Sequence, residues 1–315
     1  MTTLTKPRVT PVDLLWVAWR THRTAIFAMT GVTAAVVAGV VWSTATAENA
    51  ASGLPAIFFR LFWQPQEMNL LFGAAIAVFW GAPLVAREHE ARTNLLAWGQ
   101  DVPATRWLAG QVALLGAVAT CLAAVVWLSE QYMIDKMREL SGGNFYMPFT
   151  SWYEVAPHLQ IGYVLFGFAL GAAAGVLVRR TLPAMGIALV GFGVVRVAVI
   201  EWGRPYLLPP VHSFEAWSSD YKDQVPDYAM YVDSGYADVN GAPIDHQESW
   251  GCGGRPGTTE QLDCLKANGV AGHYADFQPL ERLGLFQWIE TGIFVVLAAA
   301  LLVLAWAWVK RARRV

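Results

Sequence analysis

Charged side chains are scarce in this chain of 315 residues, since Asp, Glu, Lys and Arg together make up 15% of it. A typical soluble domain carries about a quarter. The shortage is uneven, because long apolar runs alternate with short charged ones, and hydrophobic residues reach 55%. This pattern excludes an ordinary soluble globular protein and is typical of a multi-pass membrane protein.

Residues that carry enzymatic or metal chemistry are few and scattered. His89–Glu90 lacks the second histidine of the HExxH zinc motif. No Ser/His/Asp or Cys/His set converges in the sequence. Acidic residues gather between Asp233 and Glu248, but their spacing is not that of a calcium-binding loop, and we interpret them as solvated turn residues. The sequence therefore predicts neither an enzyme nor a metal site.

Lysine is also rare, with five residues, and its scarcity decides how one motif is interpreted. Leu140–Asn144 reads LSGGN, one residue away from the LSGGQ signature of ATP-binding-cassette ATPases. Such an ATPase also needs a phosphate-binding loop, GxxxxGK[ST], whose lysine contacts the β- and γ-phosphates. No lysine of this chain follows a glycine. We therefore expect LSGGN to be a glycine-rich turn and the chain to hydrolyse no ATP.

Six apolar segments are long enough to cross a hydrocarbon core of roughly 30 Å as helices, which takes about 20 residues each. They are Ala25–Ala45, Asn69–Ala86, Trp107–Leu128, Pro157–Val178, Leu182–Ile200 and Leu285–Val309. Ala45–Thr46–Ala47 resembles a signal-peptide cleavage site, but the apolar run before it is too long for such a leader, which favours a retained span.

The distribution of basic residues predicts the orientation, because Lys and Arg are enriched in cytoplasmic loops. With the N-terminus inside, the cytoplasmic segments hold 13 of the 22 basic residues within 53 positions, and the outside segments hold eight within 135. These cytoplasmic segments are 1–24, 87–106, 179–181 and 310–315. We therefore expect both termini in the cytoplasm.

Residues 1–24 contain the start of an amphipathic helix. Thr10, Pro11 and Asp13 supply a capping hydroxyl, a proline in the first turn and an acidic residue. Apolar residues on one face then oppose charged ones, as in a helix that lies on a membrane surface. A plain flanking segment is the alternative.

Residues 201–284, between the fifth and sixth spans, are polar, acidic and aromatic. Asn240–Gly241 between apolar residues predicts a β-hairpin over Tyr236–Ile244. Cys252 and Cys264 both lie in this segment, and paired cysteines outside the membrane favour a disulfide. We expect a small mixed extracellular domain with this bridge. We expect residues 285–315 to form the sixth span and a basic cytoplasmic tail.

Two charged residues interrupt the spans, Arg196 in the fifth and Glu290 in the sixth. Insertion scales give a cost of about 2.5–3.5 kcal/mol for a charge at the membrane centre, so such residues usually pair or face water. A rise of 1.5 Å per residue puts both roughly 8–9 Å below the outer surface. We predict an ion pair between them, with Glu201 as the competing partner of Arg196.

Small residues on the fourth span predict close helix packing. Gly167, Gly171 and Gly175 repeat every four residues, a spacing that lets helix backbones approach. We expect this packing within the subunit; a subunit interface is the alternative.

The cytoplasmic loop over residues 87–106 reads REHEARTNLLAWGQDVPATR and predicts a short helix over Glu88–Trp98. Leu95, Leu96 and Trp98 form an apolar patch that would be exposed to water unless a partner covers it. A solvated hairpin that joins two spans is the alternative. The order of acidic residues, Thr93, an apolar triplet, then Val102–Pro103 and Arg106 resembles the ABC-2-type transporter permease family. The sequence of this loop is most similar to the corresponding loops of actinobacterial drug-exporter permeases. The segments Phe286–Thr291 and Arg179–Ala184 also resemble that group.

The resemblance implies an all-α membrane subunit of a type V ABC exporter in a bacterial plasma membrane. It implies an N-terminal elbow helix, six spans over residues 25–200 and 285–315, and a homodimer. Each copy would dock on a separate ATPase chain that binds ATP and Mg, with no cofactor in this chain. The coupling residues implied are Glu88, Glu90, Arg92, Thr93, Leu95, Leu96 and Trp98. Many family members have Gly in place of Arg92.

In related exporters the second and fifth spans face the central cavity, which implies a substrate path along them. The residues that would line it are Phe72, Phe79, Trp80, Phe192, Val195, Arg196 and Val199. Ordinary packing in the core or against lipid is the alternative for each. The expected function is export of hydrophobic or amphipathic compounds, with drug, peptide and lipid all open. The alternative is a sensor or structural membrane protein whose outer domain binds a ligand or an envelope partner.

Overall fold

The computed structural model describes residues 10–46, 65–91, 103–140, 148–150, 152–217, 225–244, 252 and 259–312. The chain divides into two compact units. The helical unit comprises Met1–Tyr146, Ser151–Val197 and Gln287–Val315. The sheet unit comprises Met147–Thr150 and Ala198–Phe286, and so contains the whole of the predicted domain 201–284.

Six helical segments in the described part of the chain are long and apolar enough to cross a membrane, one for each predicted span. They consist of α1 (Pro11–Ala45), α3 (Pro65–Ile76) with η2 (Ala77–Gly81) and α4 (Pro83–Glu90), α6 (Ala104–Leu140), α7 (Pro157–Val178), α8 (Thr181–Ala198) with η4 (Val199–Gly203), and α10 (Leu283–Ala312). The six-span prediction is confirmed. The main difference is α6, which continues twelve residues past the predicted end at Leu128.

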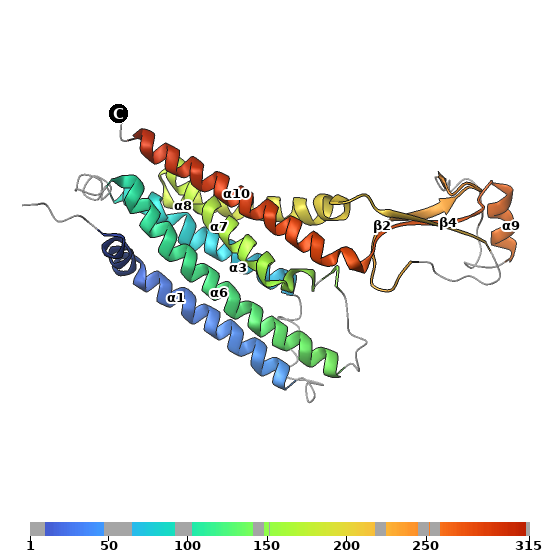
Figure 1. Ribbon diagram of the computed structural model, residues 1–315, viewed down its shortest axis with the longest axis horizontal. Coiled ribbons are helices and arrows are strands. Elements are labelled where there is room, and N and C mark those ends of the chain that lie inside the picture. Colours follow the sequence, from blue (N-terminus) through green and yellow to red (C-terminus); the bar gives the residue numbers. More distant parts are fainter. Residues whose placement is uncertain are drawn as a thin grey trace, which may run out of the picture. The chain divides into compact units, whose positions relative to one another are not determined.

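Helix α1 contains both the predicted elbow segment and the first span without a break. Its start is capped as the sequence indicates, because the backbone N–H of Thr10 donates to Asp13 Oδ2 at 2.8 Å and Thr10 Oγ1 accepts from the Asp13 N–H at 3.3 Å. The ribbon changes direction near the beginning of this helix (Figure 1). A placement of these first turns on a membrane surface stays a prediction.

Helix α7 lies at the centre of the helical unit, and most of its side chains are buried. Its glycines face a single groove on α3, η2 and α4, where a Cβ at Gly167, Gly171 or Gly175 would lie within 2.6 Å of a backbone carbonyl oxygen. These oxygens belong to Gly73, Ala77 and Ala82. The close contacts explain why this stripe has no side chains, and the predicted packing within the subunit is confirmed.

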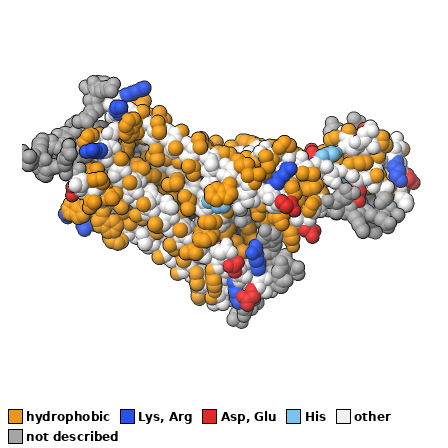
Figure 2. All heavy atoms as spheres, viewed as in Figure 1, with side chains coloured by type: hydrophobic (Ala, Val, Ile, Leu, Met, Phe, Trp, Pro, Cys, Tyr) orange, Lys and Arg blue, Asp and Glu red, His pale blue; other side chains and the backbone are white. Residues whose placement is uncertain are grey.

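The surface of the helical unit is apolar. In the space-filling view, hydrophobic side chains are spread over its visible face, and few charged side chains lie among them (Figure 2). Large apolar residues such as Leu182, Val190 and Val194 on α8, and Val296 and Val303 on α10, are exposed. A surface of this kind suits contact with lipid chains rather than water.

The sheet unit is built on four antiparallel strands in the order β1-β4-β2-β3. The strands are β1 (Val211–Ala216), β2 (Met230–Ala237), β3 (Pro243–Ile244) and β4 (Gly272–Gln278), with helix α9 (Thr259–Ala267) between β3 and β4 in sequence. A disulfide joins Cys252 to Cys264, which lies on α9. The small sheet domain and its disulfide are therefore as predicted.

The predicted hairpin is present, since Tyr236 pairs with Ile244 across β2 and β3. Its turn contains Gly241 at a φ of 81°, a conformation that favours glycine. Asp238 accepts the backbone N–H groups of Ala242 and Asn240 at 2.9 and 2.8 Å, which lowers the pKa of its carboxyl. This acidic residue serves the turn, as the sequence indicates.

Candidate functional site

Two of the seven predicted coupling residues, Glu88 and Glu90, lie in the described part of the chain. They end helix α4, which begins at Pro83, so the helix predicted to start near Glu88 begins as part of the second span. The remaining five lie outside the described residues: Arg92, Thr93, Leu95, Leu96 and Trp98.

Glu90 connects the end of α4 to the start of α8. Its Oε1 accepts the backbone N–H of Thr181 at 2.9 Å, and its Oε2 accepts the Thr181 hydroxyl at 2.5 Å. The first N–H groups of a helix have no partner within the helix, and a carboxylate there both satisfies one of them and complements the helix dipole. Glu90 is therefore an external cap on α8.

The connection from α7 to α8 is short, so that the start of α8 lies within hydrogen-bond distance of Glu90. Arg179 adopts a left-handed conformation with φ 58°, which ends α7, and α8 begins two residues later at Thr181. The end of α4, the end of α7 and the start of α8 thus meet at one point.

The residues predicted to line a substrate path do not form one surface. Trp80 and Phe192 are buried in the packed interior, where the Phe192 ring stacks on Phe166 with centroids 5.8 Å apart. They fit core packing, the alternative given by the sequence, better than a path. Phe79 is exposed, and Val195 and Val199 are half-buried.

Phe72 does border open space, a cavity of about 230 Å³ between α1, α3 and α6. Met29 and Val36 of α1, Met68 of α3 and Val126 of α6 are among its walls, which are almost entirely apolar. Thr33 also lines it; this side chain is 3% exposed, and its hydroxyl has no hydrogen-bond partner among the described residues. The cavity suits an apolar group.

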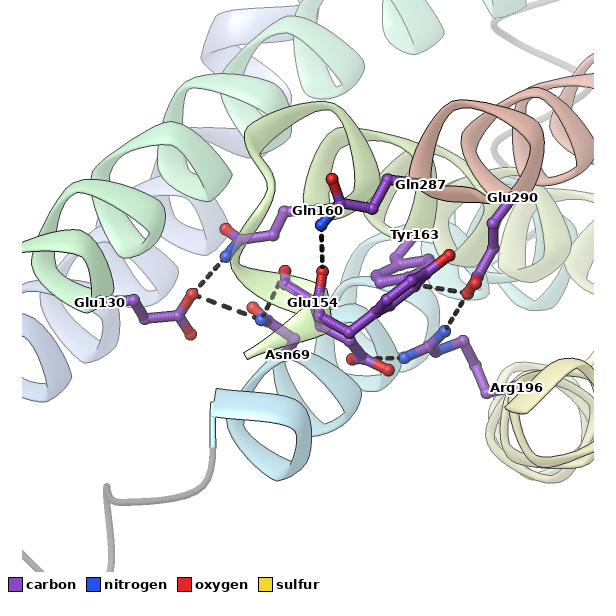
Figure 3. Close-up of polar contacts among 9 residues, drawn as sticks. Asn69, Glu130, Glu154, Gln160, Tyr163, Arg196, Gln287 and Glu290 are labelled. Atoms are coloured by element: carbon purple, nitrogen blue, oxygen red, sulfur yellow. Dashed lines mark hydrogen bonds and ion pairs between the residues drawn. The ribbon is translucent and has the colours of Figure 1, made fainter. Parts of the chain in front are cut away.

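Arg196 is the centre of a buried ion cluster (Figure 3). Its Nη2 lies 2.6 Å from Glu154 Oε2, and its Nη1 lies 3.3 Å from Glu290 Oε1. The Tyr163 hydroxyl donates to Glu290 Oε1 at 2.7 Å, and the guanidinium carbon lies 3.6 Å from the centroid of the Tyr163 ring. Arg196, Glu154 and Glu290 are each 0% exposed. The charges are thus withdrawn from solvent and paired.

A second group of polar side chains continues from this cluster. Asn69 Nδ2 donates to the backbone oxygen of Glu154 at 3.3 Å and to Glu130 Oε2 at 3.4 Å. The Gln160 amide donates to the same oxygen of Glu130, and the Gln287 amide donates to the backbone oxygen of Tyr153 at 2.9 Å. This polar network of Asn69, Glu130, Glu154, Gln160, Tyr163, Arg196, Gln287 and Glu290 joins α3, α6, η3 (Tyr153–Val155), α7, α8 and α10.

The predicted pairing of Arg196 with Glu290 is present, and Glu201, the competing partner, is exposed. Sequence reasoning missed Glu154 and Glu130, because both fall in the stretch 129–156 assigned to an outside loop. A signal was available in the polar residues Asn69, Gln160 and Tyr163 near the ends of predicted spans, since polar groups within a membrane usually have partners.

Metal binding has no support in the described part of the chain, where no group of three or more His, Cys, Asp or Glu side chains is arranged to hold an ion. The third cysteine, Cys121 on α6, is a free thiol.

A family model described as ABC-2 membrane transporter related matches residues 24–204. Comparisons with curated proteins and with solved structures gave no match. The matched stretch is more than half of the 315 residues and runs from α1 to η4. It includes Glu90, Thr181 and most of the polar network, with Arg196 among them. The chain therefore belongs to the ABC-2 membrane transporter related family, whose members are membrane subunits of transporters.

Proposed function

We propose that this chain is the permease subunit of an ABC exporter, driven by ATP hydrolysis on a separate ATPase chain. The observation that carries the proposal is the contact between Glu90 and Thr181. It joins the end of α4, next to the proposed coupling segment, to the start of another membrane-spanning helix. A displacement of that segment would therefore be transmitted directly to α8 through this contact.

The charge distribution supports a cytoplasmic position for this contact. Helix α1 begins and α10 ends at the same end of the helical unit (Figure 1), where blue Lys and Arg side chains are visible in Figure 2. Basic residues are enriched in cytoplasmic segments. Those in the described part of the expected cytoplasmic segments are Arg20, Arg23, Arg87, Arg106, Arg179, Arg180, Lys310 and Arg311.

Close packing between the start of α4 and α7 extends this mechanical connection to α7. A Cβ added at Gly175 on α7 would lie 2.4 Å from the backbone oxygen of Ala82, directly before α4. Since the two backbones are in contact there, α4 cannot shift without moving α7. When the two ATPase chains close on ATP and Mg, the displacement of the coupling segment would thus tilt α3–α4, α7 and α8 together.

The proposed substrates are hydrophobic or amphipathic compounds, moved outward by a homodimer of this chain. The support is the apolar cavity beside Phe72, which suits the nonpolar part of such a molecule. The sheet unit would lie outside the cell, where its disulfide is stable.

The contact between Glu90 and Thr181 provides the test. Glu90→Gln and Thr181→Val each remove part of it. Glu139→Gln serves as the matched control, because Glu139 on α6 is exposed and forms an ion pair with Lys136 of its own helix. ATP-driven uptake of a hydrophobic dye into inverted vesicles should fall roughly tenfold in the first two variants, the effect of about 1.4 kcal/mol on a rate. Co-purification with the ATPase chain should persist. Uptake at the wild-type level in both variants would contradict the proposal.

A further inference from the structure

The polar network encloses more negative than positive charge. Glu130, Glu154 and Glu290 are each 0% exposed, as is Arg196. Arg196 contacts Glu154 and Glu290, whereas Glu130 forms no ion pair within the described part of the chain. If every group were ionised, three carboxylates would face one guanidinium. Within the described residues, Glu130 is the carboxyl of the network that has no cation beside it.

The hydrogen bonds of Glu130 leave room for a proton on its carboxyl group. Its Oε2 accepts amide N–H groups from Asn69 and Gln160. Its Oε1 is buried and has no hydrogen-bond partner among the described residues, and the same holds for Oε1 of Gln160. A half-turn of the Gln160 amide exchanges its donor for its acceptor. A carboxylic O–H on Glu130 would then donate to Gln160 Oε1, and this oxygen would no longer lack a donor.

The surroundings of Glu130 favour a proton over a metal ion. The partners of Glu130 among the described residues are neutral amides. An ionised carboxylate in such surroundings within an apolar interior is unfavourable, and groups of this kind take up a proton instead. A metal would need further carboxylate or imidazole ligands, and the described residues contain no such cluster. The other titratable or charged groups of the network are Glu154 on η3, Tyr163 on α7, Arg196 on α8 and Glu290 on α10.

We infer that Glu130 is a proton-binding site within the membrane. It carries a proton while α3, α6 and α7 pack around it. The inference requires the helical unit to lie in a bilayer and does not depend on which compound the protein moves.

A hydrophobic carbodiimide tests the site chemically. The O–H of a neutral carboxylic acid adds across one C=N bond of dicyclohexylcarbodiimide, the proton moving to nitrogen and the carboxyl oxygen bonding to carbon. The adduct rearranges to an N-acylurea, which retains every atom of both reactants and is located by peptide mass spectrometry. Ionised carboxylates paired with Arg196 lack the proton that this reaction needs.

The reagent is added to membranes that contain the full chain with its ATPase partner. We expect Glu130 to be labelled several-fold more than Glu154 or Glu290, with labelling that declines as the pH of the medium is raised. A water-soluble carbodiimide should label exposed Glu139 and leave Glu130 unmodified. In Glu130→Gln, labelling at position 130 should be lost.

Two outcomes would overturn the inference, and both use the wild-type chain, so they stand if Glu130→Gln fails to fold. The first is absence of label on Glu130 in samples where Glu139 reacts with the soluble reagent. The second is protection of Glu130 by sodium ions at constant pH, because a metal cation would then occupy the site in place of a proton.

Discussion

Arg196 connects two carboxylates that come from different parts of the chain. A guanidinium presents several N–H donors in a rigid planar fork, so a single side chain contacts Glu154 on η3 and Glu290 on α10 at once. A lysine at the same place would be a single point charge. The choice of arginine therefore follows from the need to join two acidic partners in a buried site.

Loss of the ion pairs that Arg196 forms should lower the stability of the folded protein. Removing one partner of a buried ion pair destabilises proteins by about 3–5 kcal/mol, because the other charge stays buried without compensation. We expect Arg196→Ala and Arg196→Lys to reduce the yield of folded protein in detergent, measured by size-exclusion chromatography. Glu201→Gln is the matched control, since Glu201 is exposed. A wild-type yield of Arg196→Ala would refute this role.

The second carboxylate also determines the expected result of a charge exchange between Arg196 and Glu290. Arg196→Glu combined with Glu290→Arg would restore a simple pair, but the new glutamate would face Glu154. We therefore expect the double variant to express no better than the single ones. Recovery of folded protein in the double variant would mean that Glu154 contributes little.

At this scale the sequence predicted one contact of the cluster and missed the others. Arg196 and Glu290 could be paired from their equal depth in antiparallel spans. Glu154 could not, because it lies on the short helix η3, and a residue outside the spans gives no depth to compare. The partners of Glu130 depend on how far α6 extends.

Among the elements, α6 was the hardest to delimit from sequence. Its apolar run ends near Leu128, and charged residues follow, which suggested a loop. The helix nevertheless continues, because Glu130, Met133, Ile134 and Met137 recur at helical spacing and are buried against neighbouring elements. Hydropathy finds a span, but the periodicity of the polar extension was needed to find the end of the helix.

Helix α7 depends on small residues to a degree that can be measured. A Cβ at Gly171 would lie 2.1 Å from the backbone oxygen of Ala77. We expect Gly171→Ala to destabilise the helical unit by about 1–3 kcal/mol, the usual range for overpacking. Thermal aggregation in detergent would report the loss.

Gly116 on α6 supplies the comparison, because a Cβ there would meet nothing within 4 Å. Alanine has the higher helix propensity, so Gly116→Ala should be neutral or slightly stabilising. If both variants were equally stable, α7 would not be packed against η2 as described.

On the scale of the whole molecule, the sheet unit has its own covalent constraint. Cys252 and Cys264 are 12 residues apart, and a disulfide that closes a loop of about 15 residues contributes roughly 3 kcal/mol in the chain-entropy model. We expect Cys252→Ser to make this unit sensitive to protease added to intact cells. Cys121→Ser should have no such effect. Equal resistance of both variants would show that the bridge is dispensable or that the unit is not outside.

The central claim is that this chain moves its substrate only through a separate ATPase. The direct measurement is ATP-dependent uptake of a hydrophobic dye by proteoliposomes that contain the chain alone, the co-purifying ATPase alone, or both. We predict uptake with both and none with either one, and no ATP hydrolysis by the chain alone. ATP hydrolysis or ATP-driven uptake by the chain without its partner would contradict the account.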